Sequence, residues 1–338
     1  MDMLSLDKLP QKILAKMDLE TVFMASRLIL AAERLQLFRK LHGKKLNASR
    51  IGKLMKLSPK YLTLFLDALV SIGMLRKKED LYWNSSLAEK YFIQERSIFW
   101  TRQFSAECVE KFEALTVLEK VLKSGKNSWT IRGKKKQSYL DSMRKYPQEA
   151  KDFTQMLYHY HQEDAEALAE YLDLSKFNSV LDVGGGSGVM SIALVKNNPH
   201  LRACILDIEP VCQIARQNIK KAGLSRRIST ISGDMRKELP SGYDVVVCCD
   251  IGPISKHLLR MAYQRLPYDG LIALVDRFLS EDMTEPLDRI MNNLAGSSFG
   301  METKGEMVEM LSTCGFKNIE SHKFYKHVWV ITGRKTKT

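Results

Sequence analysis

A glycine-rich turn lies between an apolar stretch at Ser179–Val183 and an apolar helical pattern. The turn contains Gly184, Gly185 and Gly186, and Asp182 stands just before it. Glycines let the backbone turn tightly and approach a nucleotide-like ligand, with the N-terminus of the next helix behind it. Many proteins carry such a turn, so its meaning depends on the residues that follow at set distances.

Acidic residues follow at the ends of the next two predicted strands. Asp207, with Ile208 after it, comes about twenty residues after the turn, where a carboxylate can accept both hydroxyls of a ribose. Gly233, Asp234 and Met235 end the third strand, which places a carboxylate near an adenine amino group and a thioether beside the ring. Three consecutive strand ends therefore predict a crevice for an adenosine-containing ligand.

A dinucleotide oxidoreductase is the competing interpretation of these glycines. Its fingerprint, G-x-G-x-x-G, requires a glycine at position 189. Val189 stands there, so the spacing disfavours that class.

Alternating strands and helices must position these residues, and alternation of this kind predicts a parallel sheet. Helical periodicity covers 97–122 and 139–173. Beyond it, strands are predicted at 179–183, 202–207, 228–233, 243–249, 270–276, 317–324 and 327–333, and helices at 188–197, 210–222, 254–266 and 303–314.

The N-terminal part shows a different pattern. A long amphipathic helix is predicted at 18–41, then two short helices at 47–54 and 58–72, then a hairpin of 74–76 and 81–83. This order is typical of a winged helix. Its second helix is apolar on nearly every face, whereas a helix that reads DNA needs exposed polar and basic side chains. Burial in a domain or dimer interface is therefore expected, and nucleic-acid binding is not.

Length, charge and cysteine content limit which kinds of protein this chain can be. The 338 residues suggest two domains. Lys and Arg exceed Asp and Glu by 52 − 39 = 13, which makes an anionic partner worth considering. Asp2, Asp7 and Lys8 do not fit a signal peptide, and the apolar runs are shorter than the roughly 20 residues of a membrane span. The six cysteines lack C-x-x-C spacing, so a cytoplasmic protein without disulfides or a metal site is expected.

The order of elements, with D-V-G-G-G-S-G at the first strand, I-L-D at the second and G-D-M at the third, resembles the class I methyltransferases. Within them it is similar to the plant and bacterial small-molecule O-methyltransferases, the caffeate and acetylserotonin type. The resemblance implies an α/β, Rossmann-like domain whose mostly parallel sheet has an antiparallel C-terminal strand, and an all-α, winged-helix dimerisation domain before it. It divides the chain into 1–95 for dimerisation, 96–172 as a helical linker and lid, and 173–338 for S-adenosylmethionine.

The resemblance also implies site residues and partners. S-adenosyl-L-methionine is the expected cofactor, and the enzyme is expected to be a homodimer that acts on a small aromatic or ring-bearing metabolite of secondary metabolism. Met156, His159 and Asn293 are then expected in the substrate pocket, and Tyr160 and Cys249 join the cofactor-binding set.

The sequence departs from the family at the two residues that catalyse O-methylation, a histidine and the glutamate that orients it. O-methylating members have a His in an L-H-D-W-like segment that removes a proton from the acceptor hydroxyl, but here 243–253 is contracted and has no His. Their orienting Glu is replaced by Met301, and Thr303 with Glu306 is typical of a helix capping box. His159, Asp250 and His257 are the remaining candidates for a base.

Three functions stay open. The first is methyl transfer, to oxygen by family or to nitrogen, sulfur or carbon because a good nucleophile needs no dedicated histidine. The second is non-methylating chemistry, such as decarboxylation or hydroxylation, on the same cofactor. The third is a winged-helix regulator that binds nucleic acid.

Overall fold

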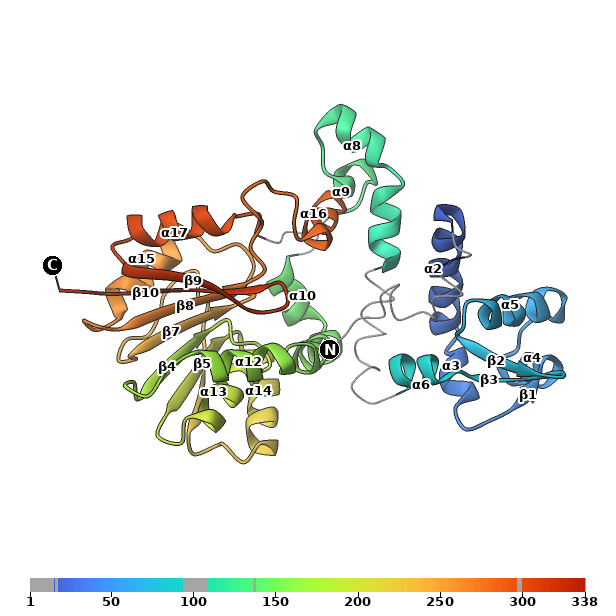
Figure 1. Ribbon diagram of the computed structural model, residues 1–338, viewed down its shortest axis with the longest axis horizontal. Helices are drawn as coiled ribbons and strands as arrows, with labels where there is room; N and C mark the ends of the chain where they lie inside the picture. The colour runs from blue at the N-terminus through green and yellow to red at the C-terminus, as the bar shows by residue number, and fades with distance from the viewer. Residues whose placement is uncertain (1–14, 16–17, 94–107, 136–137, 297–299, 338) are drawn as a thin grey trace. The chain divides into compact units, whose positions relative to one another are not determined.

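The computed structural model describes residues 15, 18–93, 108–135, 138–296 and 300–337. The chain forms two compact units, residues 1–109 and 110–338 (Figure 1). In the described residues, no helix is both long and apolar enough to cross a membrane.

The N-terminal unit has the predicted winged-helix order. Its antiparallel three-stranded sheet has the order β1-β3-β2. The elements are α2 (Leu19–Arg34), α3 (Leu37–Leu41), β1 (Leu46–Asn47), α4 (Ala48–Met55), α5 (Pro59–Ser71), β2 (Leu75–Lys78), β3 (Leu81–Asn84) and α6 (Ser86–Phe92).

The single long helix predicted at 18–41 is wrong, because the chain breaks between α2 and α3. Gln36 adopts a left-handed conformation with φ of 57°. That conformation costs roughly 1–2 kcal/mol for a non-glycine residue. The break lets Leu37, Phe38 and Leu41 be buried in the core of this unit, and each such side chain contributes about 1.5–3 kcal/mol. Burial therefore outweighs the strain.

Helix α5 is apolar on more than its buried side. Leu62, Leu66 and Leu69 recur at helical spacing and are buried. Tyr61 and Leu64 are exposed on the other side. The helix therefore presents a largely apolar outer surface, as its sequence predicts.

The C-terminal unit contains a seven-stranded sheet of order β6-β5-β4-β7-β8-β10-β9. The first five are parallel, and β10 runs antiparallel to both β8 and β9. The strands are β4 (Ser179–Val183), β5 (Arg202–Asp207), β6 (Ile228–Ser232), β7 (Val245–Cys249), β8 (Leu271–Asp276), β9 (Lys317–Tyr325) and β10 (Val328–Arg334).

Helices precede the sheet and alternate with its strands. Of the helix predicted at 97–122, residues up to 107 lie outside the described residues, and 108–115 are helical. The others are α8 (Leu118–Ser124), α9 (Ser128–Ile131), α10 (Tyr139–Lys145), α11 (Pro147–Tyr160), α12 (Gln162–Tyr171), α13 (Val189–Asn197), α14 (Glu209–Lys221), α15 (Lys256–Arg265), α16 (Leu287–Leu294) and α17 (Lys304–Thr313).

Both faces of the sheet are covered at its centre, so the inner strands β5, β4, β7 and β8 read as nearly continuous apolar runs. Residues alternate between the faces: Val180 packs on the side of α12, α13 and α14, and Leu181 on the side of α15 and α17 (Figure 1). The predicted α/β class, with a mostly parallel sheet and an antiparallel C-terminal strand, is confirmed.

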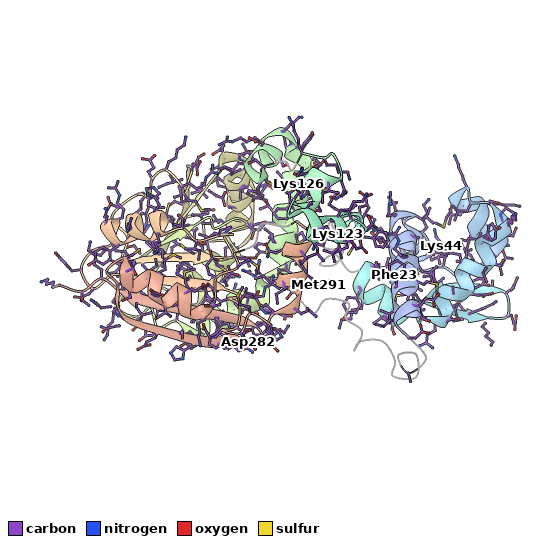
Figure 2. The ribbon with its side chains drawn as sticks, turned by 90° about the horizontal axis from the view of Figure 1, so that it is seen from above. Phe23, Lys44, Lys123, Lys126, Asp282 and Met291 are labelled. Atoms are coloured by element: carbon purple, nitrogen blue, oxygen red, sulfur yellow. The ribbon has the colours of Figure 1, made fainter. Side chains whose placement is uncertain are left out.

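Two helices, α16 and α17, follow β8. The sequence predicted only the second of them. Helix α16 was not predicted, and its exposed side carries Leu287, Met291 and Leu294, whereas its buried side carries Arg289. Figure 2 shows Met291 on this helix. Helix α17 begins at the predicted capping box, in which Thr303 and Glu306 each bond the other's backbone N–H.

Candidate functional site

The glycine turn follows β4 and packs tightly against the neighbouring strand ends. Gly184 has φ of 65°, and a Cβ there would lie 2.8 Å from Cγ2 of Ile251 and 3.2 Å from Sδ of Met235. At Gly186, with φ of 56°, a Cβ would meet nothing nearer than 3.8 Å, the carbonyl oxygen of Gly184. The turn is therefore closed on the side of β7 and open above Gly186, where a ligand could approach the backbone.

Asp207, at the end of β5, is joined directly to this turn. The backbone N–H of Gly186 donates to Oδ2 of Asp207 at 2.9 Å, and that of Ile208 donates to Oδ1 at 2.7 Å. Burial raises the pKa of Asp207 to about 6 against these two bonds. Each carboxylate oxygen keeps a second lone pair. These remaining acceptor positions on Asp207 and the open space above Gly186 fit the hydroxyl groups of the ribose of S-adenosylmethionine.

Asp182 lies beneath the turn, fully buried. Its Oδ2 accepts a hydrogen bond from Ser191 Oγ at 2.7 Å, and its Oδ1 has no hydrogen-bond partner among the described residues. A Cβ on Gly185 would lie 2.6 Å from the Asp182 carboxyl carbon. Burial raises the pKa of Asp182 to about 6. This side chain therefore touches the underside of the turn.

The third strand end lies beside the turn. Met235 comes from the residues after β6 and packs under Gly184. Asp234 binds the guanidinium of Arg236, with Oδ1 2.9 Å from Nε and Oδ2 2.7 Å from Nη2. That hydrogen bond lowers the pKa of Asp234 to about 2. The structure thus brings Met235 to the turn and leaves the Asp234 carboxylate paired with a neighbouring arginine.

A chain of alternating charges lies at the carboxyl ends of β7 and β8. His161, which ends α11, places Nδ1 3.0 Å from Oδ2 of Asp164 and Nε2 3.4 Å from Oδ2 of Asp250. On the other side of Asp250, Nη2 of Arg289 is 3.8 Å from its Oδ1 and 2.5 Å from Oδ1 of Asp276. We call these five residues the charged cluster. Each of its charges has an opposite charge beside it, as buried ions require.

Burial and pairing act against each other in the charged cluster. Burial by itself lowers the pKa of His161, but the carboxylates of Asp164 and Asp250 outweigh it and raise that pKa to about 9. Burial raises the pKa of Asp250, but His161 and nearby arginines outweigh it, and the pKa lies below its ordinary value. Burial and the Asp250 charge raise the pKa of Asp276 to about 6. Near pH 7 both His161 and Asp250 are therefore charged.

Tyr160 and Cys249, two predicted cofactor-binding residues, adjoin the charged cluster. The Tyr160 ring packs edge-on to that of His161, with centroids 4.8 Å apart. Burial raises the pKa of Tyr160, and it raises that of Cys249 well above the ordinary range. Arg277, just after β8, binds Asp288 at 2.7 Å. The charged cluster and these side chains lie near the glycine turn, since Ile251, the neighbour of Asp250, packs against Gly184.

The other predicted site residues are distributed over three helices. His159 lies in α11 with its ring edge-on to the preceding tyrosine, and Met156 is buried on the same helix. Asn293 lies one turn after Arg289 in α16 and donates to its carbonyl oxygen at 3.0 Å. His257 is exposed in the first turn of α15. The ion pairs of the charged cluster include Asp250 and neither of these histidines.

Sequence reasoning missed four members of the charged cluster. Asp276 carried a usable signal, because it ends a predicted strand as Asp207 does. His161 belongs to the Tyr-His-Tyr-His run that also contains His159, but helical spacing alone did not select it. Asp164 lies only three positions after its partner His161, but that local spacing was not used. Arg289 gave no signal, since its partners are distant in sequence and α16 was not predicted.

Comparisons with known proteins match both units. Residues 116–317, more than half of the chain, match the family model of the O-methyltransferase domain. Residues 17–94 match the O-methyltransferase dimerisation domain.

Individual proteins are also similar. The 3-hydroxy-5-methyl-1-naphthoate 3-O-methyltransferase of Streptomyces sahachiroi is 23% identical over 318 residues, covering 91% of this chain and 90% of that protein. The L-tyrosine C(3)-methyltransferase of Streptomyces lavendulae is 40% identical over 126 residues, 36% of this chain and 34% of that protein. The crystal structure of human N-acetylserotonin methyltransferase in complex with S-adenosylmethionine shares the fold, with a TM-score of 0.78 and 22% identity, over 94% of this chain and 96% of that one. The chain therefore belongs to the O-methyltransferase family and is an S-adenosylmethionine-dependent methyltransferase.

Proposed function

We propose that this methyltransferase acts on a hydroxyl group of a small aromatic or other ring-bearing metabolite. The observation that carries the proposal is that the cofactor site and the charged cluster adjoin. In the cofactor site, the backbone N–H of Gly186 is bonded to Asp207. The charged cluster includes Asp250, and the next residue, Ile251, packs against Gly184 of the glycine turn. A methyl donor held at the first site would face an acceptor held at the second. The naphthoate 3-O-methyltransferase among the relatives is named for an aromatic hydroxy acid.

Each residue of the first site has a distinct part in this proposal. Asp207 accepts the ribose hydroxyls, and Gly186 admits the ligand close to the backbone. Met235 packs beside the adenine, Asp234 lies at its edge, and Asp182 holds the turn from below. When bound, S-adenosylmethionine supplies an activated methyl group on a sulfonium. Holding the acceptor in line with that methyl group is the main task of the protein, because orientation by itself can remove a large part of such a barrier.

The assembly and location belong to the same proposal. We propose that residues 1–95 join two copies into a homodimer, that 96–172 form a linker and lid, and that 173–338 bind the cofactor. The match of residues 17–94 to a dimerisation domain supports the first point. Free thiols are present at Cys204, Cys212, Cys248, Cys249 and Cys314, which supports a reducing, cytoplasmic location.

Methylation at an aromatic carbon is the second candidate. The relative with 40% identity over 126 residues is named for transfer to carbon 3 of L-tyrosine. A phenol ring activated by its hydroxyl is a carbon nucleophile, and the family's catalytic His is absent from 243–253. The accessible carboxylate of Asp250 could hold such a ring through its hydroxyl group.

Two measurements test the proposal. Calorimetric titration with S-adenosylmethionine and S-adenosylhomocysteine should show micromolar binding of both. The protein is then incubated with methyl-labelled S-adenosylmethionine and, separately, 3-hydroxy-1-naphthoate and L-tyrosine. Label on the naphthoate oxygen supports O-methylation, and label on the tyrosine ring supports the second candidate. Binding without transfer to either probe would contradict the proposed acceptor class, and absence of binding would contradict the cofactor site.

A further inference from the structure

Asp250 is the most accessible member of the charged cluster. Its side chain is 24% exposed, against 14% and 15% for His161 and Asp164 and 5% or less for Asp276 and Arg289. It is also the most loosely paired, with contacts of 3.4 and 3.8 Å to its two cations. A hydrogen bond to a carboxylate is shorter than either distance. The Asp250 oxygens therefore keep lone pairs for another donor.

The backbone at Asp250 is held in an uncommon conformation. Its φ is +48°, a region that costs a residue with a side chain roughly 1–3 kcal/mol and that concentrates at functional sites. The backbone N–H of Asp250 donates to the carbonyl oxygen of Val275 at 3.0 Å. This bond fixes the backbone where β7 ends. The chain therefore turns away from the direction of β7 at Asp250, and the Asp250 side chain lies in the charged cluster.

His161 cannot serve as the base in this arrangement. Nδ1 faces the Asp164 carboxylate and Nε2 faces that of Asp250. An imidazole with both nitrogens against carboxylates is a double donor, with no lone pair for an acceptor proton. Its place between two acids makes it a fixed positive charge.

Arg289 is fixed in a similar way on the opposite side. Nη2 binds Asp276, and Nη1 donates to the carbonyl oxygen of Gly300 at 3.0 Å. The guanidinium is only 3% exposed. These bonds hold one positive charge near Asp250 without covering its carboxylate.

We propose that Asp250 is the catalytic residue that receives the acceptor's hydroxyl proton, and that His161 and Arg289 are positioning residues that keep its carboxylate ionised and in place. This inference rests on the proposed function. It assigns to Asp250 the chemical task of the histidine that the contracted segment 243–253 lacks.

The proton transfer to this carboxylate accompanies the methyl transfer. The acceptor O–H donates to an oxygen of Asp250. As the acceptor oxygen forms its bond to the methyl carbon, the O–H bond breaks and its proton passes to Asp250. The carbon–sulfur bond breaks and its electron pair stays on sulfur, which leaves neutral S-adenosylhomocysteine and a methyl ether. The protonated Asp250 then returns its proton to water through its exposed side.

Several neighbouring charged groups change the pKa of Asp250. His161 and Arg289 are adjacent, Arg277 adds a third positive charge, and Asp276 opposes them. Asp164 acts through His161, whose Nδ1 it faces. The three cations keep the pKa of Asp250 below its ordinary value despite burial. The carboxylate is therefore ionised throughout the neutral range, and it can accept the hydroxyl proton because that proton becomes more acidic as positive charge develops on the attacking oxygen.

The first test compares Asp250→Asn with Asp282→Asn in the full-length protein. Asp282 lies at the surface of the same unit, outside both sites (Figure 2). We expect Asp250→Asn to lower kcat for methylation of 3-hydroxy-1-naphthoate by about 10²–10⁴, and Asp282→Asn to leave it unchanged. Calorimetry should show S-adenosylhomocysteine affinity within about threefold of wild type for both.

The outcomes separate this inference from the proposed function. Equal kcat for Asp250→Asn and wild type would overturn the inference and leave the proposed function intact. Loss of S-adenosylhomocysteine affinity in Asp250→Asn would also overturn it, because Asp250 would then serve the cofactor. Absence of transfer by the wild-type protein would overturn both.

The second test is the pH dependence of kcat in His161→Gln, with His322→Gln, at an exposed histidine of β9, as the matched control. With S-adenosylmethionine saturating at every pH, so that protonation of Asp207 does not limit the rate, wild type should keep a level kcat from pH 8 down to about pH 5, since Asp250 stays ionised. Loss of the imidazolium should raise the pKa of Asp250, so the acid limb of His161→Gln should move up by about one pH unit or more. A uniform fall in rate at every pH would show a merely structural role. If Asp250→Asn did not fold, this profile would decide the question by itself.

Discussion

Two aspartates at the glycine turn share a raised pKa and differ in what surrounds them. Asp207 is bonded to two backbone N–H groups and lies where the turn is open. Asp182 is fully buried and bonded to Ser191. A buried carboxylate resists ionisation because water no longer solvates its charge. Burial therefore makes ligand binding depend on pH at Asp207, and it makes the stability of the fold depend on pH at Asp182.

Asp207→Ala should weaken the binding of S-adenosylhomocysteine by well over tenfold, because two hydroxyl contacts and the bond to Gly186 are lost together. In wild type the affinity should also fall as pH drops through about 6, where Asp207 takes up a proton. Calorimetric titrations at pH 5 and pH 8 check both points. Exposed Asp141→Ala on α10 is the control, and an unchanged affinity in Asp207→Ala would refute the ribose site.

Asp182→Asn tests the cost of the buried charge. The pKa of Asp182 is about 6 in the folded protein and near 3.8 when unfolded. Between these values the folded state binds the proton more tightly, so wild type gains stability as pH falls through this window. Above pH 6 the ionised carboxylate costs about 3 kcal/mol, and the neutral amide of the variant would avoid that cost. The variant's unfolding free energy relative to wild type should therefore be higher at pH 8 than at pH 4, as urea titrations at both pH values would measure.

At the scale of elements, a short helix secures the end of α16. Ser128 Oγ in α9 donates to the carbonyl oxygen of Ala295, and Nε1 of Trp129 donates to that of Gly296, each at 3.2 Å. A Cβ on Gly296, whose φ is +93°, would lie 2.8 Å from Ser128 Oγ and 3.0 Å from Trp129 Nε1. Since α16 carries Arg289, this contact helps to place the charged cluster.

Gly296→Ala should therefore loosen α9 from α16. Amide hydrogen exchange across 127–134 should accelerate by about tenfold or more, because a four-residue helix has little stability without tertiary contacts. Gly125→Ala is the control, since a Cβ there meets nothing within 4 Å although φ is also positive. Equal exchange in the two variants would mean that the contact between α9 and α16 does not stabilise this segment.

At the scale of the whole molecule, the N-terminal unit exposes apolar side chains on α2. Leu19, Phe23 and Met24 are 91%, 52% and 48% exposed. Contiguous apolar surface on a folded unit marks an interaction site. The match of this region to a dimerisation domain makes a second copy of the chain its proposed partner.

Phe23→Asp should weaken the proposed homodimer by at least about tenfold, because a carboxylate placed in an apolar interface must lose its water. Light scattering over a range of protein concentrations would show monomer in the variant where wild type is dimeric. Tyr268→Asp, at an exposed site before β8, should leave the dimer intact. A monomeric wild type would refute the homodimer itself.

The sequence predicted the parts of this protein that depend on local pattern. Glycines, strand-ending acids and regular apolar spacing located β4, β5 and the turn between them, because these features depend on backbone geometry and on burial along one element. The cofactor-binding residues from Asp182 to Met235 are a prediction of the same kind, since they lie at the ends of neighbouring parallel strands, whereas Tyr160 entered only through the family resemblance. Gln36 shows the limit, because a left-handed residue that breaks a helix in favour of core burial has no local signature.

Only the tertiary structure decided which charged side chains meet. His161 and Asp250 are 89 positions apart in the sequence, and Asp250 and Arg289 are 39 positions apart. No local pattern around any of these residues indicates which of the others it contacts. Their association follows from the placement of α11, α16 and the ends of β7 and β8 at one edge of the sheet. Electrostatic pairing acts through space over a few ångströms, so the charged cluster could be recognised only after the fold had brought these residues together.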